Sequence, residues 1–299
     1  MGKSSLSAIT TSGSNTAIGH SAGLSLTTGD GTTFLGTSAG ESVTTGAAGT
    51  IAGFQAGQYL TTGDDNTAFG KQALRSVSTG SSAAGNTAVG SGALKSNTTG
   101  NNLVAVGGSA LDANTTGSSN TAVGKAALTT LTTGGSNTGV GTSAIEAVST
   151  GDSNTALGVA AGATVSTGGG NTCIGKGADT NATSRNNAIA IGQEVTVAAD
   201  NRVTIGSGSN VASLELNGSD TSWAASSDER LKENITDSTA GLSFINDLRP
   251  VTYNWKKAKD VPNDLPQYID GSDNPCLGSE YGKELHGFIA QEVKTVIDN

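Results

Sequence analysis

The sequence predicts an all-β repeat solenoid, a parallel β-roll or β-helix with a 17-residue period, followed by a small α+β domain. The first observation is a unit that reads N-T-A-x-G, two variable residues, Ala, and then Thr-Thr-Gly, and that recurs about eleven times. The second is the spacing, because nine of the ten intervals between core glycines are 17 residues and one is 20. Such fixed self-similarity indicates a solenoid or an array. The core glycines are Gly19, Gly36, Gly53, Gly70, Gly90, Gly107, Gly124, Gly141, Gly158, Gly175 and Gly192.

A second series of glycines has the same spacing and the same single break. Both series place a three-residue insertion between Gly80 and Asn86, where two residues have become S-S-A-A-G. The second series consists of Gly29, Gly46, Gly63, Gly80, Gly100, Gly117, Gly134, Gly151 and Gly168. Glycine at two fixed corners permits positive φ, which a tightly turning coil needs.

Three positions in each unit are expected to form the core. The residue before each core glycine is bulky and apolar except in one copy, where Ala52 follows Ile51. A second apolar row lies seven residues after the glycine, with Asn97 and Asn114 as exceptions, and Ala stands three residues after it. We therefore expect each coil to direct two bulky residues and one small residue inward. The first row is Ile18, Leu35, Phe69, Val89, Val106, Val123, Val140, Leu157, Ile174 and Ile191, and the second is Leu26, Val43, Leu60, Val77, Leu131, Val148 and Val165.

The local chemistry favours short strands. T-A-V and T-A-I are β-branched and too brief for a helix. Stacked copies would align equivalent residues about 4.8 Å apart. Thr and Asn ladders can then satisfy hydrogen bonds between coils. Only 4% of the chain is aromatic, which suits a thin rod rather than a broad globular core.

Composition changes sharply near residue 222, and this predicts the domain boundaries. Before it there is no proline and only 20 residues are charged (8 basic and 12 acidic); after it come all four prolines, both tryptophans and 21 charges (8 basic and 13 acidic). We expect solenoid repeats over 1–192, closing strands and a junction over 193–222, and a different domain over 223–299. In the junction, Asn201–Gly206 is one further copy, and Val211–Gly218 alternates with period two and ends on Asn-Gly, which predicts a final strand and turn.

The charge balance and the termini exclude several classes of function. A net charge of −9 argues against a nucleic-acid partner, because phosphate binding needs clustered Lys and Arg. No stretch of eighteen apolar residues exists, so no membrane insertion is expected. The N-terminus lacks the apolar region of a signal peptide and, with Leu6, the myristoylation pattern. Of the two cysteines, Cys173 replaces a repeat Ala and is interpreted as a small buried thiol rather than a disulfide partner or ligand.

Two apparent motifs are better explained by the repeat. Residues 170–177 read GNTCIGKG, but Gly177 stands where a P-loop has Ser or Thr, so we expect no nucleotide site. A periodic calcium site would require a periodic carboxylate, and the acidic residues Asp30, Asp64, Asp65 and Asp152 are irregular. No cofactor and no metal are therefore predicted.

The N-x-A-x-G array over about residues 13–192 resembles the parallel β-roll of trimeric surface adhesin heads and related repeats of bacteriophage tail fibres. This resemblance implies a homotrimer, whereas the period alone would also fit a monomeric left-handed β-helix.

The C-terminal segment contains three short stretches whose sequences and order can be compared with known domains. They are S-S-D-E-R-L-K-E-N-I from Ser226, L-R-P-V-T-Y-N-W-K from Leu248, and H-G-F-I-A-Q-E-V from His286. Together they resemble the intramolecular chaperone domain of phage tail fibres and tailspikes, the peptidase family S74. The resemblance implies that the domain assists trimer assembly and then cuts itself off at the Ser226–Ser227 bond. It implies Ser227 as the catalytic serine and Lys232 as the catalytic lysine.

The chemistry of such a pair is reasonable. A serine hydroxyl needs a neighbouring base, and lysine can serve when burial lowers its pKa. In a regular helix residues five apart point about 140° from each other. Ser227 would therefore precede the helix, or Lys232 would act on a neighbouring chain. Taken without the resemblance, Ser226 and Glu229 form a capping box, and the stretch would be a capped surface helix.

Two further features of this segment are interpreted from the residues. His286 is either a third participant or a structural histidine beside Gly287, and we favour the structural role. Residues 288–298 carry apolar residues at helical spacing and predict an amphipathic helix. The family domain normally continues beyond a point corresponding to Asn299, so the chain is expected to be a fragment.

The leading hypothesis is a phage tail-fibre protein, located in the virion and assembled in the host cytoplasm, that binds a glycan or protein receptor on the host cell. The alternative is a bacterial trimeric surface adhesin with a non-cleaving C-terminal cap. A glycan-hydrolysing tailspike would need paired carboxylates on one face of the rod, whereas Glu41, Asp112 and Glu146 are isolated. The repeat segment is therefore expected to be non-enzymatic.

Overall fold

In a computed structural model the chain divides into two units, Met1–Ser226 and Ser227–Asn299. The structure describes residues 2–77, 80–216, 247–254, 256–263, 268, 270–273 and 285–298.

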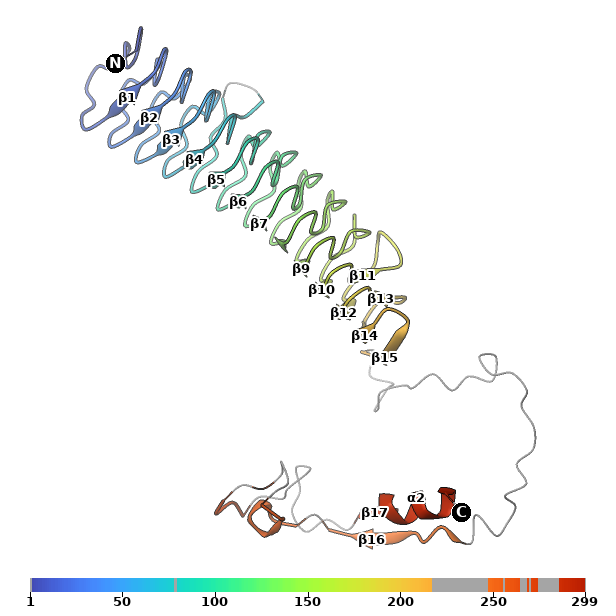
Figure 1. The fold of residues 1–299 in the computed structure, drawn as a ribbon. Coiled ribbons are helices and arrows are strands. Elements are labelled where there is room, and N and C mark those ends of the chain that lie inside the picture. Colours follow the sequence, from blue (N-terminus) through green and yellow to red (C-terminus); the bar gives the residue numbers. More distant parts are fainter. Residues whose placement is uncertain are drawn as a thin grey trace. The chain divides into compact units, whose positions relative to one another are not determined.

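The first unit is a β-solenoid of about eleven turns, as the repeat predicts (Figure 1). Each turn contributes one three-residue strand, and neighbouring strands pair in parallel, with Thr16, Ala17 and Ile18 opposite Thr33, Phe34 and Leu35. The strands are β1 (Thr16–Ile18), β2 (Thr33–Leu35), β3 (Thr50–Ala52), β4 (Thr67–Phe69), β5 (Thr87–Val89), β6 (Val104–Val106), β7 (Thr121–Val123), β8 (Thr138–Val140), β9 (Thr155–Leu157), β10 (Thr172–Ile174), β12 (Ile189–Ile191) and β14 (Arg202–Ser207). A hairpin closes the sheet, because β15 (Asn210–Glu215) pairs antiparallel with β14. A small second sheet pairs β11 (Asp179–Thr180) with β13 (Thr196–Val197).

The prediction that the bulky row before each core glycine faces inward is wrong. The central residue of each strand is the buried one, and the row before the glycine faces outward, with Ile18 54% and Phe69 60% exposed. Successive strand residues point to opposite faces, so a three-residue strand can bury its centre or its two ends but not both. Here the centre is buried, and it is Ala in most turns.

The other two predicted core rows are confirmed. The Ala row is fully buried from Ala22 to Ala178, and the row seven residues after the glycine is buried with one exception. That exception, Val77, is 57% exposed, while Ser76 is buried beside it. The Ser76 hydroxyl donates a hydrogen bond to the carbonyl of Asn97 at 2.7 Å.

The backbone N–H of Thr61 donates to the carbonyl of Ser81, and that of Ser82 donates to the carbonyl of Thr98. The three extra residues therefore lie before Ser81, and the prediction that they follow Gly80 is wrong.

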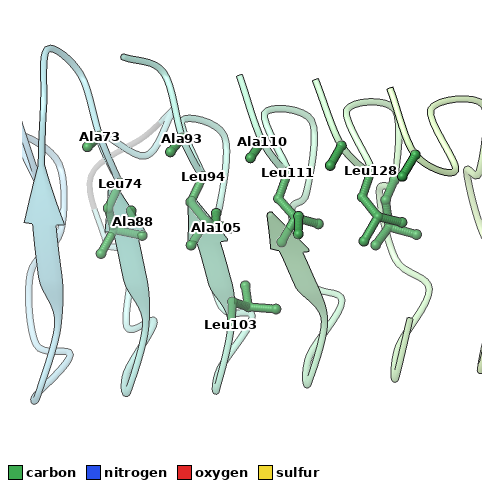
Figure 2. Packing of buried hydrophobic residues seen from close by; sticks show 14 of the residues in the cluster. Ala73, Leu74, Ala88, Ala93, Leu94, Leu103, Ala105, Ala110, Leu111 and Leu128 are labelled. Carbon is green, nitrogen blue, oxygen red and sulfur yellow. The ribbon is translucent and has the colours of Figure 1, made fainter. Parts of the chain in front are cut away.

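A fourth core position, four residues after the glycine, explains why small strand centres suffice. Leu74, Leu94, Leu111 and Leu128 occupy it in the middle turns, and Figure 2 shows them stacked between Ala88, Ala105 and their neighbours. In the second and third turns this position is Gly40 and Gly57, and the strand centres are the large residues Phe34 and Ile51 instead. A Cβ atom on Gly40 would collide with the ring of Phe34, and one on Gly57 would lie 3.0 Å from Ile51 Cδ1. Neighbouring positions thus exchange volume to keep the narrow core filled.

The two glycine series serve different purposes. The core glycines have φ between 121° and 141°, as predicted for a corner. The second series, apart from Gly80, does not have positive φ. Glycine is required there because a Cβ on Gly117, for example, would collide with the Gly134 carbonyl of the next turn. The prediction of positive φ at both corners is therefore wrong for the second series.

Asparagine and threonine ladders connect the turns, as predicted. The buried Asn137 donates its backbone N–H to Asn120 Oδ1 at 2.8 Å, and its own Oδ1 accepts the N–H of Asn154 at 2.9 Å. On another side, the hydroxyl of Thr98 donates to the carbonyl of Thr115 at 3.0 Å. These bonds satisfy backbone groups that the narrow coil leaves between strands.

The second unit is small. Strand β16 (Val251–Tyr253) pairs antiparallel with β17 (Leu285–Gly287), a 3-10 turn η2 spans Ala258–Asp260, and helix α2 spans Ala290–Asp298. The predicted amphipathic helix is confirmed, although it begins two residues after Phe288.

Candidate functional site

The predicted cleavage site lies outside the described residues. Ser226, Ser227 and Lys232 all fall within 217–246, as do the predicted Asn-Gly turn after β15 and the capping box. The catalytic assignment of Ser227 and Lys232 therefore remains a prediction.

The described residues do bring together the other two stretches on which the family resemblance rests. Val251 lies opposite Gly287 in the β16–β17 pair, so L-R-P-V-T-Y and H-G-F-I-A-Q-E-V are neighbours. Arg249, just before β16, forms two hydrogen bonds with Glu292 of α2, from Nε at 3.1 Å and from Nη2 at 2.6 Å. This is the paired geometry that Arg and carboxylate groups favour. Two residues 43 positions apart in the sequence thus meet in an ion pair, beside the strand pair that joins their motifs.

His286 occupies a strand position rather than a cavity. It lies opposite Thr252 in the β16–β17 pair and is exposed. A place in a regular strand is consistent with the structural role favoured for it.

The charges of this unit are arranged as local ion pairs. The Arg249 guanidinium lowers the pKa of the Glu292 carboxyl, chiefly by hydrogen bonding. Hydrogen bonds from Lys257 and Lys259, at 2.7 and 2.8 Å, lower the pKa of Asp273 to about 2. All three ion pairs lie at the surface, where such pairs contribute little to stability, so their main effect is to orient the segments that they join.

In the solenoid, the irregular acidic residues have structural roles. Asp64 Oδ1 accepts the backbone N–H of Ala47 at 2.8 Å, and Asp152 Oδ1 accepts that of Gly135 at 2.6 Å. In both cases the donor lies 17 residues earlier, one turn along the rod. These aspartates therefore link consecutive turns, and no group of three metal-ligating side chains occurs in the part of the chain that the structure describes.

Other polar candidates likewise belong to the rod. Residues 170–177 form β10 and the corner at Gly175, not a loop that opens a helix. Glu41 accepts a hydrogen bond from Gln58 at 2.9 Å, and Asp112 lies 3.8 Å from Lys95. Within the described ranges, none of Glu41, Asp112 and Glu146 forms a carboxylate pair.

Cys173 is the small buried thiol that the repeat predicts. It is 1% exposed at the centre of β10, and it forms no disulfide. Burial, with a smaller contribution from the nearby Asp179 carboxylate, raises the pKa of its thiol to about 12. Such a thiol is inert, so Cys173 is a core residue rather than a reactive one.

Sequence reasoning missed the surface that these strands create. The ten bulky residues before the core glycines are turned outward and form a row along the solenoid that is interrupted only at Ala52. The signal was available in the alternation of T-A-x, but alternation alone leaves open which phase is buried.

Comparison with known proteins gives one match. Residues 227–299 match the family Peptidase_S74, described as chaperone of endosialidase. Neither the curated proteins nor the solved structures gave a match. Among the described residues, no helix is long and apolar enough to cross a bilayer. A β-solenoid of about eleven turns joined to a C-terminal segment of the chaperone of endosialidase family fits a tail-fibre-like protein with a C-terminal chaperone domain.

Proposed function

We propose that this chain is a tail-fibre structural protein that assembles as a homotrimer and whose C-terminal region assists assembly and then releases itself. The observation that carries the proposal is the family match, which begins at residue 227 directly behind the solenoid unit. The mature fibre would then end at Ser226, and the released region would begin with the predicted nucleophile.

The proposed reaction is a single hydrolysis of the Ser226–Ser227 peptide bond. The hydroxyl of Ser227 attacks the carbonyl carbon of Ser226, and the neutral amine of Lys232 accepts the hydroxyl proton. The bond from the carbonyl carbon of Ser226 to the nitrogen of Ser227 breaks as that nitrogen takes up a proton, so the Ser226 acyl group is held as an ester on the Ser227 oxygen. Water then hydrolyses this ester. One water is consumed, and the products are a carboxylate on Ser226 and an amine on Ser227. The chemistry uses neither a metal nor a cofactor.

Host attachment completes the proposal. A stiff rod of stacked turns can hold a binding surface away from its point of anchorage, which is the task of a fibre. We place the assembled trimer in the virion, after assembly in the host cytoplasm, with a host surface glycan or protein as the receptor.

The intact mass of the purified chain tests the cleavage, with any residues that naturally follow Asn299 included. We expect two fragments that separate between Ser226 and Ser227 in the wild type. Ser227→Ala and Lys232→Ala should each leave one uncut chain, because each removes one half of the pair. Ser226→Ala is the matched control and should still be cut.

Two results would contradict the proposal. Cleavage of Ser227→Ala at the same bond would show that Ser227 is not the nucleophile. An uncut wild type in a well-formed trimer would make the C-terminal region a passive cap, as in a surface adhesin.

A further inference from the structure

The outward face of the solenoid strands carries an apolar row that no described residue of the first unit covers. In β1–β10 and β12 the outward end residues are a row of Thr, replaced by Val104 and Ile189 in two strands, and the bulky row before the glycines. We call the bulky row, together with Ile205 of β14, the apolar stripe. Its members are Ile18, Leu35, Phe69, Val89, Val106, Val123, Val140, Leu157, Ile174, Ile191 and Ile205.

The stripe contains no charge. The chain has 25 acidic and 16 basic residues, yet not one of them lies in β1–β10 or β12. The solvent-facing side of a sheet normally carries charged residues, which keep it from associating. Here that side carries only apolar and hydroxyl side chains over eleven consecutive strands of the sheet.

The stripe also runs along the whole sheet with a single gap. Members on neighbouring strands are directly paired and lie about 4.8 Å apart, and the row extends over about 50 Å, with the gap at β3, where Ala52 stands between Leu35 and Phe69. The three-residue insertion does not interrupt it, because Phe69 still pairs with Val89 across the 20-residue interval. The one small member of the series, Ala52, is covered to 8% exposure between Leu35 and Phe69.

Its size matches a contact surface. With three residues per strand at about 3.3 Å each, the face is about 10 Å wide, so it amounts to roughly 500 Å². This area includes the row of Thr, and the largest apolar patch on a typical monomer is of a similar size and is often functional. The position after each glycine extends the face with exposed Phe54 and Val159, and supplies polar neighbours such as Lys125. An apolar centre with a polar rim is the usual anatomy of a protein interface.

We propose that the apolar stripe is the surface through which three copies of this chain pack, parallel and in register, around a common axis. The proposal rests on the trimer of the proposed function and assigns it a surface. A second copy is the occupant because only a ladder with the same rise can match the stripe, side chain to side chain, over about 50 Å. Identical copies provide that rise, and an uncharged row brings no like charges together when it faces itself.

The test compares charge insertion in the stripe with charge insertion elsewhere on the rod. Val123→Asp combined with Leu157→Asp places buried carboxylates at two heights of the proposed axis, which should separate the chains. Val77→Asp is the control, because Val77 is more exposed than Val123, at 57% against 36%, but lies off the stripe. Light scattering on the full chain measures the mass of the native particle, and the ratio of this mass to the mass of one chain gives the number of chains in it. Self-cleavage does not change this number, because the mass of the chain is taken from the same sample. We expect three chains per particle for the wild type and for the control, and one chain per particle for the stripe variant.

Each other outcome is decisive. A stripe variant that remains trimeric would overturn the stripe as the interface and leave the trimer standing. A wild type with a ratio of one or two would overturn the trimer of the proposed function itself. A control that dissociates while the stripe variant does not would place the contact on another face.

Circular dichroism shows whether the stripe variant retains its β-structure. Should the fold be lost, cysteine cross-linking replaces charge insertion, in a Cys276→Ser background that leaves only the buried Cys173. Val123→Cys should give disulfide-linked chains on oxidation, because equivalent residues meet at the axis, whereas Val77→Cys should not. Cross-linking at Val77→Cys alone, or at neither position, would overturn the proposal.

Discussion

The adjacent glycines Gly107 and Gly108 show how strictly the repeat constrains a single residue. Gly107 has φ of 136°, and a Cβ atom on it would lie 2.5 Å from the carbonyl oxygen of Gly124 in the next turn. Gly108 does not have positive φ, and its nearest neighbour for a Cβ is the Ser91 carbonyl oxygen at 3.9 Å. Gly107 is therefore required both by its backbone conformation and by the closeness of the next turn, whereas another residue could replace Gly108.

This contrast predicts opposite effects of the same substitution. Gly107→Ala should destabilise the solenoid by about 3–5 kcal/mol, because backbone strain adds to a clash that only a shift of the next turn can relieve. Gly108→Ala should be neutral or stabilise by up to about 1 kcal/mol, because it only restricts the unfolded chain. Thermal and guanidinium unfolding followed by circular dichroism measure both. Equal effects of the two substitutions would contradict the assigned role of the core glycine.

At the scale of the element, the sequence predicted the period, the strands and two of the core rows. These follow from spacing and from residue types that repeat without ambiguity. The direction of the bulky row could not be predicted correctly. A strand of three residues can bury either its central residue or its two end residues, and the larger end residues suggested the wrong choice. The decisive fact is tertiary: Leu94 and its equivalents already fill the narrow interior, so the strand centre must be small. The surface that results was consequently missed.

The exchange of volume between positions can be tested as a pair. Gly40→Leu should destabilise strongly, because the Phe34 ring already occupies that space. The double variant Gly40→Leu with Phe34→Ala restores the arrangement of the middle turns, where Leu94 has φ of 52° in the equivalent position. We expect it to recover at least about 2 kcal/mol of the loss. The two single variants are the controls, and additive effects in a double-mutant cycle would show that the positions do not share one space.

At the scale of the whole molecule, the fold followed from the repeat but the chemistry did not. Nothing in the spacing of Ser227 and Lys232 distinguishes a catalytic pair from a capped helix, so that assignment depends on family resemblance. By contrast, Arg249 and Glu292 lie far apart in the sequence, and only the β16–β17 pairing explains why they meet. Long-range contacts of this kind leave no local signal.

The repeat also gives a physical reason for a chaperone at one end of the chain. Three rods with a 17-residue period can pack along their stripes in several registers, because a shift by one turn places nearly identical residues opposite one another. Such a shift loses only the contacts of the terminal turn, so the rod by itself discriminates weakly between registers. A C-terminal region that aligns the three chains at one fixed end would select the correct register before the rods pack.

Refolding therefore should depend on the C-terminal region even though the finished rod does not. After unfolding in guanidinium and dilution, the uncut Ser227→Ala chain should return to a native-to-chain mass ratio of three. A chain that ends at Ser226, as cleavage would leave it, should instead give a mixture of masses and aggregates, because misaligned rods expose part of their stripes. Light scattering after refolding measures the difference, and the same two proteins before unfolding are the controls. A uniform trimer recovered from the shortened chain would show that the rods set their own register, and it would remove the need for the C-terminal region in assembly.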